Sequence, residues 1–350
     1  MDLGLIGLPG AGKSAVLRLL TGAPAGTRTA VAQVPDPRLD VLASLFHPRK
    51  LTRASIGLTE LPAFLPGRTP RAEVNTVLDL ARRADALMAV IRCFRDPAVP
   101  HPLSAVEPER DARALIEELI LADLERVESV AARLGKSHAR KPEETRALEA
   151  LTLCQPVLEG GQPLRGAGLT EEQSASLSGY GLVTGKPLLL AANLDEEDLR
   201  GGQGVPAPLR ALAAEAGVAV IPFCAAVEEE IAALEAAERA DFLAAYGLEE
   251  TGAERLARAA YAALGLISFL TAGEDEVRAW PIRAGTRARQ AAGKVHSDIE
   301  RGFIRAEVAG WADLERAGSW KALREQGRLR IEGKDYVVQD GDVIEYRFNV

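Results

Sequence analysis

The stretch from Gly7 to Ser14, GLPGAGKS, constrains the fold most strongly, because it matches the pattern GxxxxGKS/T. An apolar run, Leu3–Gly7, precedes it, and a helical pattern, Ala15–Thr21, follows it. Glycines allow successive backbone N–H groups to point into one concavity, and the N-terminal end of the helix adds positive charge. The sequence therefore predicts a strand, a phosphate-binding loop and a helix at the start of an α/β domain.

Two side chains of this loop have distinct predicted roles. Lys13 is expected to reach the β- and γ-phosphate oxygens of a nucleotide, and the Ser14 hydroxyl is expected to ligate Mg²⁺. The predicted phosphate contacts are Pro9, Gly10, Ala11, Gly12, Lys13, Ser14 and Ala15. A strand–turn–helix that holds no ligand is the alternative.

Three further apolar runs are typical of buried parallel strands: Ala86–Phe94, Pro187–Asn193 and Val218–Cys224. Helical patterns separate them, at Arg71–Arg83, Pro206–Ala216 and Glu228–Tyr246. This alternation predicts an α/β domain with a mostly parallel sheet. No apolar run approaches the ~20 residues of a membrane span. The 3 separated cysteines favour a reducing, cytoplasmic setting over a disulfide framework or a zinc site.

Two segments depart from the alternation. From Pro108 to about Gly181, long helices at Glu109–Leu134 and Pro142–Leu158, joined by a polar basic turn, predict an inserted helical hairpin. Thr170 and Gln173 fit a capping box for a third, short helix. After a predicted linker, LTAGEDE, strand-like runs such as EVRAWPI, GFIRAEV and KDYVVQDGD, with two helical patches, predict a small α+β module such as a β-grasp.

The charge distribution bears on partners. The net charge of −8 argues against a surface that binds nucleic acid throughout. From Val277 to the end, however, 14 basic residues outnumber 11 acidic ones. A mildly basic C-terminal module on an acidic body points to RNA or another polyanion as a partner, and ordinary solvated surface charge is the alternative.

The parts that usually hold Mg²⁺ and sense the γ-phosphate are altered. No DxxG pattern lies between Ser14 and Ile91, and the expected place reads ELPA, so that Glu60 is the candidate substitute for the Asp and Ala63 replaces the Gly. Only Thr27 and Thr29 are candidates for the switch threonine. A simple loop without switching is the alternative for this region.

The base-recognition region also departs from a GTPase pattern, because NKxD is replaced by NLDE. Asn193 ends a predicted strand, Leu194 occupies the Lys position and Glu196 the Asp position. Guanine selectivity is therefore weakened, and an amide such as that of Asn193 could meet the N6 donor of adenine. A helix cap is the alternative for Asn193. The next strand ends in CAAVE, so that Cys224, Ala225 and Val227 are predicted to line the base.

These blocks together resemble the Obg-like ATPase family, the YchF-type P-loop proteins, over nearly the whole length. The matching stretches include GLPxxGKS, VPDPRLD, VIRCF, CAAVE, EVRAW, QAAGKVHSD, GFIRAEV and EGKDYVVQDGD. The last four identify the C-terminal part with a TGS domain, a β-grasp module.

The resemblance implies a domain organisation and a function. Residues 1–107 and 186–265 would form the nucleotide-binding domain, 108–185 the helical arm and 266–350 the TGS domain. It implies that Asn193 and Glu196 favour ATP over GTP, and that the arm and the TGS domain meet ribosomes or RNA. It makes His101, after the RCF strand, a candidate catalytic substitute, with an inert loop histidine as the alternative.

Departures from the family pattern give three hypotheses. Gly10 and Ala11 replace the usual Asn and Val, the switch segment is short, and Glu60–Ala63 replaces DIAG. The sequence therefore predicts a divergent member with weak or no hydrolysis. The hypotheses are a slow ATPase that switches on a ribosome, a nucleotide-binding adaptor without turnover, and a GTP-binding protein of the same fold.

Overall fold

The chain forms two compact units. The structure, a computed structural model, describes residues 1–136, 141–200 and 204–349. One unit comprises Met1–Ala30 and Gly57–Ala260, and the other comprises Val31–Ile56 and Tyr261–Val350. Among the described residues, no helix combines the length and the apolar character needed to cross a membrane.

The first unit is built on a six-stranded sheet with the strand order β2-β4-β1-β5-β6-β7. Its strands are β1 (Asp2–Ile6), β2 (Thr29–Gln33), β4 (Ser55–Glu60), β5 (Ala86–Arg92), β6 (Leu188–Asn193) and β7 (Ala219–Phe223). The pairs β4–β1, β1–β5, β5–β6 and β6–β7 are all parallel. The predicted α/β fold and its four predicted strands are confirmed, although β7 is only partly buried. β2 and β4 are additional strands.

Helices connect these strands. They are α1 (Lys13–Thr21), α3 (Arg71–Arg83), α7 (Glu196–Arg200), α8 (Ala207–Glu215), α9 (Ala225–Ala233), α10 (Ala236–Ala245) and α11 (Gly252–Ala263). The single helix predicted over Glu228–Tyr246 is wrong, because Leu234 adopts an extended conformation and ends α9. Glu228 instead holds α11 in place, since its carboxylate accepts hydrogen bonds from the amides of Gly252 and Ala253 at the start of that helix.

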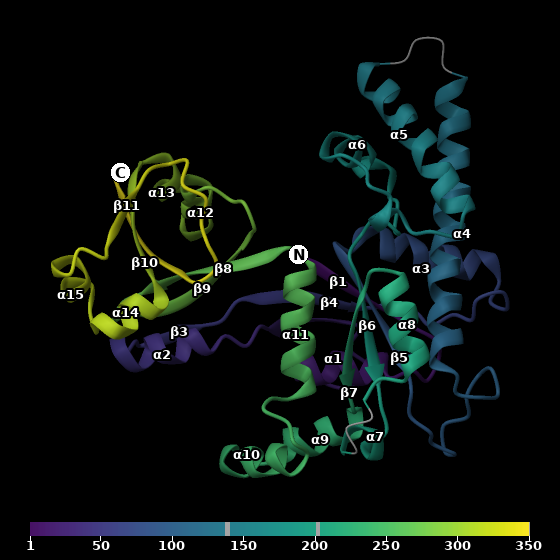
Figure 1. The fold of residues 1–350 in the computed structure, drawn as a ribbon, viewed down its shortest axis with the longest axis horizontal. Helices are drawn as coiled ribbons and strands as arrows, with labels where there is room; N and C mark the ends of the chain where they lie inside the picture. Colours follow the sequence, from purple (N-terminus) through teal and green to yellow (C-terminus); the bar gives the residue numbers. More distant parts are fainter. Residues whose placement is uncertain (137–140, 201–203, 350) are drawn as a thin grey trace. The chain divides into compact units, whose positions relative to one another are not determined.

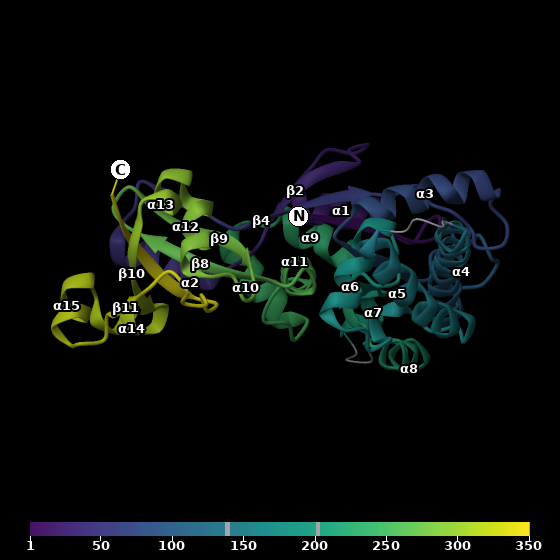
Figure 2. The same cartoon turned by 90° about the horizontal axis from the view of Figure 1, so that it is seen from above.

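The arm of the first unit consists of two long helices that lie side by side (Figures 1 and 2). They are α4 (Pro108–Gly135) and α5 (Pro142–Glu159), followed by η1 (Leu164–Gly166), α6 (Glu171–Leu177) and η2 (Ser178–Tyr180). The predicted capping box of Thr170 and Gln173 is present at α6. Most of the basic turn predicted between the long helices, residues 137–140, lies outside the described residues.

Buried Asp123 of α4 fastens the returning chain to the arm. Its carboxylate accepts hydrogen bonds from the Val183 amide at 2.9 Å, the Thr184 amide at 2.7 Å and the Thr184 hydroxyl at 2.7 Å. Burial raises the pKa of Asp123, and these three donors oppose that shift. The segment that leads into β6 is therefore held directly against α4.

The second unit has its own six-stranded sheet, with the order β11-β10-β12-β8-β9-β3. The strands are β3 (Lys50–Thr52), β8 (Leu266–Ala272), β9 (Glu276–Arg283), β10 (Phe303–Gly310), β11 (Arg330–Glu332) and β12 (Asp342–Phe348). Its helices are α2 (Pro37–Phe46), α12 (Ala288–Val295), α13 (Ser297–Arg301), α14 (Trp311–Ala317) and α15 (Trp320–Glu325). The mixed sheet with helices is the predicted α+β module.

Two details of that module differ from the prediction. LTAGEDE is not a linker, because Leu270–Ala272 belong to β8, which forms an antiparallel hairpin with β9. KDYVVQDGD is not a strand, since Val337 forms only an isolated bridge with Arg287. The β8–β9 hairpin pairs neighbouring parts of the chain, whereas the partner of Val337 lies far away along the chain.

Val31–Ile56 belongs to the second unit, although the sequence groups it with the nucleotide-binding domain. In Figure 1 the purple-blue segment α2–β3 accompanies the green and yellow strands of the C-terminal part. β3 pairs in parallel with β9. Arg38 of α2 forms ion pairs with Asp36 and with Asp340, and the Asp340 carboxylate also accepts from the Ser268 amide. The VPDPRLD block therefore builds the second unit.

Candidate nucleotide-binding site

The phosphate loop joins the carboxyl end of β1 to the start of α1, and its shape requires glycine. Gly10 and Gly12 have φ angles of 73° and 104°, which residues with a side chain rarely adopt. A Cβ at Gly12 would lie 2.5 Å from Asn193 Nδ2, and one at Gly7 would lie 2.6 Å from the Val90 carbonyl oxygen. The loop is therefore fixed both by its backbone and by its neighbours.

Lys13 lies over this loop. Its Nζ donates hydrogen bonds to the Gly7 carbonyl at 2.8 Å and the Leu8 carbonyl at 3.4 Å. The side chain is buried, and burial lowers the pKa of Lys13 to about 8, while the charge of Glu60 opposes the shift. Protein groups thus balance the positive charge of the Lys13 ammonium poorly. A phosphate oxygen would supply the negatively charged hydrogen-bond acceptor that the ammonium lacks.

Ser14 meets Glu60 across the sheet edge. The Ser14 hydroxyl donates to Glu60 Oε1 at 2.7 Å, and Glu60 is the last residue of β4. Both line a pocket of about 310 Å³ together with the predicted switch segment; the full lining is Ser14, Gly26, Thr27, Arg28, Glu60, Leu61, Pro62 and Ala63. The structure therefore brings the predicted Mg²⁺ ligand, its acidic neighbour and Thr27 together, whereas Thr29 bonds to Thr59.

Asn193 links the phosphate loop to the other end of the site. Its Nδ2 donates to the Ala11 carbonyl at 3.3 Å, and its Oδ1 accepts from the Ala225 amide at 3.0 Å. Only 3% of Asn193 is exposed. Asn193 thus positions the loop relative to the start of α9, and its predicted contact with the base stays a hypothesis.

The two other residues of the NLDE stretch have different environments. Leu194 is 1% exposed and packs in the main core, so position 194 offers no polar group to a base. The half-exposed Glu196 accepts a hydrogen bond from the Tyr246 hydroxyl at 2.8 Å and pairs with Arg200 at 3.3 Å. The Arg200 guanidinium lies 4.4 Å from the centre of the Tyr246 ring. Glu196 is therefore held by a small polar cluster.

The CAAVE stretch forms the end of β7 and the start of α9. Cys224 and Val227 are buried, and Ala225 is the first residue of the helix. Burial raises the pKa of the Cys224 thiol, while backbone N–H groups of Val227 and Ala226 oppose the shift. This keeps the thiol neutral, so Cys224 acts as a small apolar residue beside the backbone that the sequence assigns to base contact.

His101 is anchored within the loop that follows β5. Its Nε2 lies 2.9 Å from Asp111 Oδ2, and its Nδ1 accepts from the Leu103 amide at 3.2 Å. Only 4% of the side chain is exposed, and His101 is not among the residues that line the pocket of Ser14 and Glu60. In this structure His101 fastens the loop to α4, and its role in catalysis stays a hypothesis.

Arg92 belongs to this region, and sequence reasoning does not single it out. This buried residue ends β5, and its guanidinium donates to the carbonyls of Phe94 and Asp96. Its Nη1 has no hydrogen-bond partner among the described residues and lies 3.7 Å from where a Cβ on Gly10 would be. The available signal is an arginine inside an apolar strand, since a buried arginine is rare without a partner.

A mostly parallel sheet with a phosphate loop after its first strand, and with the loop lysine and serine in place, defines a P-loop nucleotide-binding protein. The chain is 38% identical to the ribosome-binding ATPase YchF of Bacillus subtilis, with 100% of both chains covered. It is 35% identical to Obg-like ATPase 1 of Oryza sativa, with 100% of this chain and 92% of that protein covered. The chain therefore belongs to the YchF/Obg-like ATPase family.

Two further comparisons agree with this assignment. A solved structure of the Schizosaccharomyces pombe YchF GTPase superposes with a TM-score of 0.88 at 28% identity, covering 99% of this chain and 97% of that one. Residues 266–349 match the family model YchF-GTPase_C, described as a protein of unknown function, DUF933. The relatives' names differ on the nucleotide, since the bacterial and rice proteins are named ATPases and the fission yeast protein a GTPase.

Proposed function

We propose that this chain is a slow, Mg²⁺-dependent P-loop ATPase that binds ATP in preference to GTP and associates with the ribosome. The observation that carries the proposal is the buried Lys13 ammonium over the glycine loop, next to the paired Ser14 and Glu60. These groups supply the cation, the backbone cradle and the oxygen ligands that a nucleoside triphosphate with its metal requires.

The residues present fit a Mg²⁺ ion. Ser14 Oγ and Glu60 Oε1 are hard oxygen ligands that lie 2.7 Å apart and line one pocket. No cluster of three or more His, Cys, Asp or Glu ligands occurs in the described part of the chain, so phosphate oxygens and water would complete the coordination. When bound, Mg²⁺ neutralises charge on the β- and γ-phosphates, and Ser14 and Glu60 would hold it.

Slow hydrolysis is supported by the residues that follow Glu60 in the lining of that pocket. They are Leu61, Pro62 and Ala63, and none of these side chains can orient a water molecule for attack on the γ-phosphate. Binding and charge neutralisation are therefore supported better than activation of water. The same lining favours a second candidate, an adaptor that binds nucleotide without turning it over.

The preference for ATP rests on the NLDE stretch. Leu194 is buried, and the Glu196 carboxylate is longer than the Asp that accepts both guanine hydrogens in NKxD. The Glu196 carboxylate remains as an acceptor for the adenine N6 group. The fission yeast relative's name, a GTPase, makes the choice of nucleotide a question for experiment.

Ribosome association rests on the relatives' names and on a basic cluster in the second unit. Arg305, Arg324 and Arg347 surround the Glu307 carboxylate, which leaves an excess of positive charge on half-exposed side chains. Exposed Ile331 lies beside them in the same shallow pocket. Guanidinium groups around an apolar residue are suited to phosphate and base contacts of RNA.

A binding and turnover experiment tests the nucleotide part. We expect calorimetry to show one ATP bound in the presence of Mg²⁺, with Lys13→Ala abolishing the affinity and Arg18→Ala, on the exposed side of α1, leaving it intact. Single-turnover phosphate release, measured with and without ribosomes, then separates the ATPase from the adaptor. Unchanged ATP binding by Lys13→Ala would refute the proposed site. ATP binding without phosphate release, both with and without ribosomes, would refute the ATPase and support the adaptor.

Base selectivity has its own test. Converting the stretch to NKDD, by Leu194→Lys with Glu196→Asp, is expected to shift the ratio of ATP to GTP affinity at least tenfold toward GTP. Glu197→Asp, one residue further along α7, serves as the control. A wild-type protein that already prefers GTP would overturn the proposed ATP preference. The proposed phosphate-binding site would not be affected by that result.

The ribosome part is tested by cosedimentation. We expect Arg324→Gln with Arg347→Gln to reduce ribosome association and to flatten its dependence on salt, because fewer phosphate contacts release fewer counterions. Arg316→Gln, an exposed arginine of the same unit that pairs with Asp313, is the matched control. Equal cosedimentation of all three proteins would count against this surface.

A further inference from the structure

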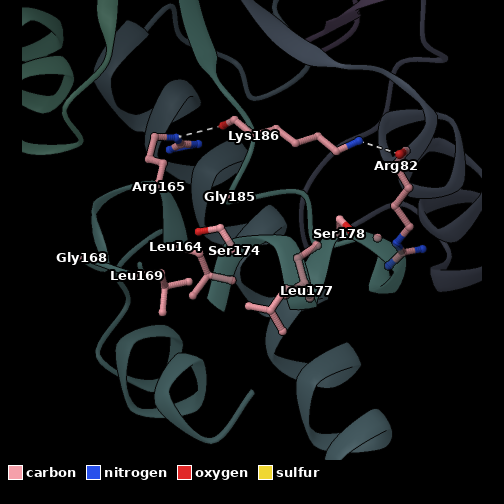
Figure 3. Close-up of a pocket in the computed structure, with 12 residues that line it drawn as sticks. Arg82, Leu164, Arg165, Gly168, Leu169, Ser174, Leu177, Ser178, Gly185 and Lys186 are labelled. Atoms are coloured by element: carbon pink, nitrogen blue, oxygen red, sulfur yellow. Dashed lines mark hydrogen bonds between the residues drawn. The ribbon is translucent and has the colours of Figure 1, made fainter. Parts of the chain in front are cut away.

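A second cavity lies in the first unit, where the arm rejoins the sheet. It has a volume of about 400 Å³, which is within the usual range for small-molecule sites. Its lining comes from the end of α3, from η1, α6 and η2, and from the segment that leads into β6. Figure 3 shows the lining residues, which include Arg82, Leu164, Arg165, Ser174, Leu177 and Lys186. It shares no lining residue with the pocket of Ser14 and Glu60.

The charge of this cavity is one-sided. Its lining contains Arg82, Arg165 and Lys186 but no Asp or Glu, although the chain as a whole carries a net charge of −8. In Figure 3, Arg165 and Arg82 lie on opposite sides of the hollow and Lys186 extends between them. A concave surface with cations and low-dielectric walls concentrates anions.

Arg165 has the least compensated charge of the three. It forms no ion pair with a described residue, and its Nη1 is buried without a hydrogen-bond partner. Within the described part of the chain its side chain makes one hydrogen bond, a long one of 3.4 Å from Nε to the Lys186 carbonyl. Burial lowers the pKa of Arg165 to about 10, and the charge of Asp123 only partly opposes this. A partly buried guanidinium with one buried, unpartnered nitrogen and no carboxylate partner is costly unless an anion completes it.

The other two cations are already engaged, and this leaves Arg165 as the centre of the site. Lys186 Nζ donates to the carbonyls of Ala81, Arg82 and Ala84 and so caps the end of α3. Arg82 pairs with the exposed Asp79, while its Nε is buried without a partner among the described residues. Asp123 is not a direct partner of Arg165, because its carboxylate accepts from Val183 and Thr184 and forms no ion pair with Arg165.

The remaining walls are apolar or weakly polar. Leu164, Leu169 and Leu177 gather below the cations in Figure 3, and Ser174 lies between them. Gly168 and Gly185 also line the hollow. A Cβ on Gly168 would have no atom within 4 Å, and a Cβ on Gly185 would lie 3.9 Å from the Cβ of Leu164. The hollow therefore offers a charged side, a hydroxyl and an apolar side.

We propose that this cavity binds a small organic anion, with a phosphate, sulfonate or carboxylate group on Arg165 and an apolar or flat body against the leucines, while Arg82 on the other side of the hollow adds positive charge. Such a ligand contacts α3, the arm and the segment entering β6 at once. Its binding stabilises the junction between the arm and the sheet of the nucleotide-binding unit, because a ligand favours the state that it binds.

The test uses 8-anilinonaphthalene-1-sulfonate, a sulfonate on an aromatic body, with the full-length protein. We expect one saturable site by fluorescence titration, and a rise in thermal midpoint with probe concentration. Arg165→Gln is expected to weaken binding at least tenfold, whereas Arg133→Gln, an exposed arginine of α4, leaves it unchanged. Ser174→Phe fills the hollow from α6 and is expected to abolish the signal if the probe enters it.

The controls separate this site from the nucleotide site. Lys13→Ala is expected to retain full probe binding, so a loss in that variant would place the probe in the phosphate loop and overturn the proposal. Binding that is unaffected by Arg165→Gln and by Ser174→Phe, or no saturable binding by the wild-type protein, would overturn it as well. Inorganic phosphate serves as a competitor that carries the anionic group alone. Displacement of the probe by millimolar phosphate supports the assignment of the charged side to Arg165. Displacement of the probe that persists in Arg165→Gln contradicts that assignment.

Discussion

At the scale of single residues, Lys13 combines a functional charge with a buried position. Its ammonium is held by two backbone carbonyls and no carboxylate of the described residues is bonded to it. Burial lowers its pKa to about 8, and a bound triphosphate would favour the charged form. Nucleotide binding and protonation of Lys13 are therefore linked, because the ligand binds the ammonium better than the neutral amine.

This linkage predicts a pH dependence of binding. The affinity for MgATP is expected to be flat below pH 8 and to fall as the pH rises above about 8, by at most about tenfold per pH unit. Calorimetry in buffers with different ionisation enthalpies is expected to show little proton uptake at neutral pH and uptake approaching one proton in alkaline solution. Lys13→Arg is the control, because its charge persists; a wild-type affinity that does not change with pH would contradict the linkage.

At the scale of elements, a few buried carboxylates decide how the pieces are joined. Asp123 joins α4 to the chain that enters β6, and Glu228 joins α9 to the start of α11. Each accepts backbone N–H groups far away in sequence. Removing such a carboxylate leaves buried donors without a partner, which costs more than the hydrogen bond alone contributes.

Asp123→Asn is predicted to destabilise the first unit by about 2–5 kcal/mol, because an amide cannot accept from all three donors of Val183 and Thr184. Urea unfolding followed by circular dichroism measures the change. Glu128→Gln, an exposed residue on the same helix, is expected to change stability by less than about 0.5 kcal/mol. A variant as stable as the wild type would show that the return segment is held by other contacts.

The strands β10 and β12 of the second unit carry an acid-sensitive cluster. Hydrogen bonds from Arg347, with help from Arg305 and Arg324, lower the pKa of Glu307 to about 2 from its ordinary 4.5. Because the folded-state pKa is depressed, this stabilisation is present above pH 4.5 and is lost as the pH falls toward about 2. The second unit is therefore predicted to lose stability in acid.

Tryptophan fluorescence can follow this loss, because all 3 tryptophans, Trp280, Trp311 and Trp320, lie in the second unit. Urea midpoints are expected to fall as the pH is lowered from about 5 to about 3 in the wild type and to fall less in Glu307→Gln. Glu332→Gln, on the neighbouring strand β11, is the control. Equal slopes for wild type and Glu307→Gln would mean that other carboxylates cause the acid sensitivity.

At the scale of the whole molecule, the chain contributes to the second unit twice, at Val31–Ile56 and after Tyr261. Leu39 and Leu42 of α2 are fully buried there. A truncation after residue 260 therefore leaves α2 and β3 without the strands they pack on. This division differs from a simple series of domains along the sequence.

Two truncations test this division. A chain of residues 1–260 is predicted to self-associate, because its α2 leucines become exposed. The same chain with residues 34–54, which lie between β2 and β4, replaced by a short Gly-Ser linker is expected to stay monomeric and to bind ATP. Light scattering and calorimetry measure the two properties. Identical behaviour of the two chains would contradict the role of Val31–Ile56.

The sequence by itself determined the local structures and the family. Glycines at positive φ, an alternation of apolar runs with amphipathic helices and the capping box at Thr170 are signals that depend on neighbours along the chain. Distant pairings were beyond it: the place of β3 beside β9 and the bridge between Arg287 and Val337 join residues that are far apart along the chain. The local break of the helix at Leu234 was also missed.

Only the tertiary structure decided which side chains meet. Ser14 reaches Glu60, Asn193 reaches both Ala11 and Ala225, and Arg165 lies beside a cavity closed by Arg82 and Lys186. The physical reason is that periodicity and backbone preference act over a few residues, whereas burial, pKa and hydrogen-bond partners are set by strand order and packing.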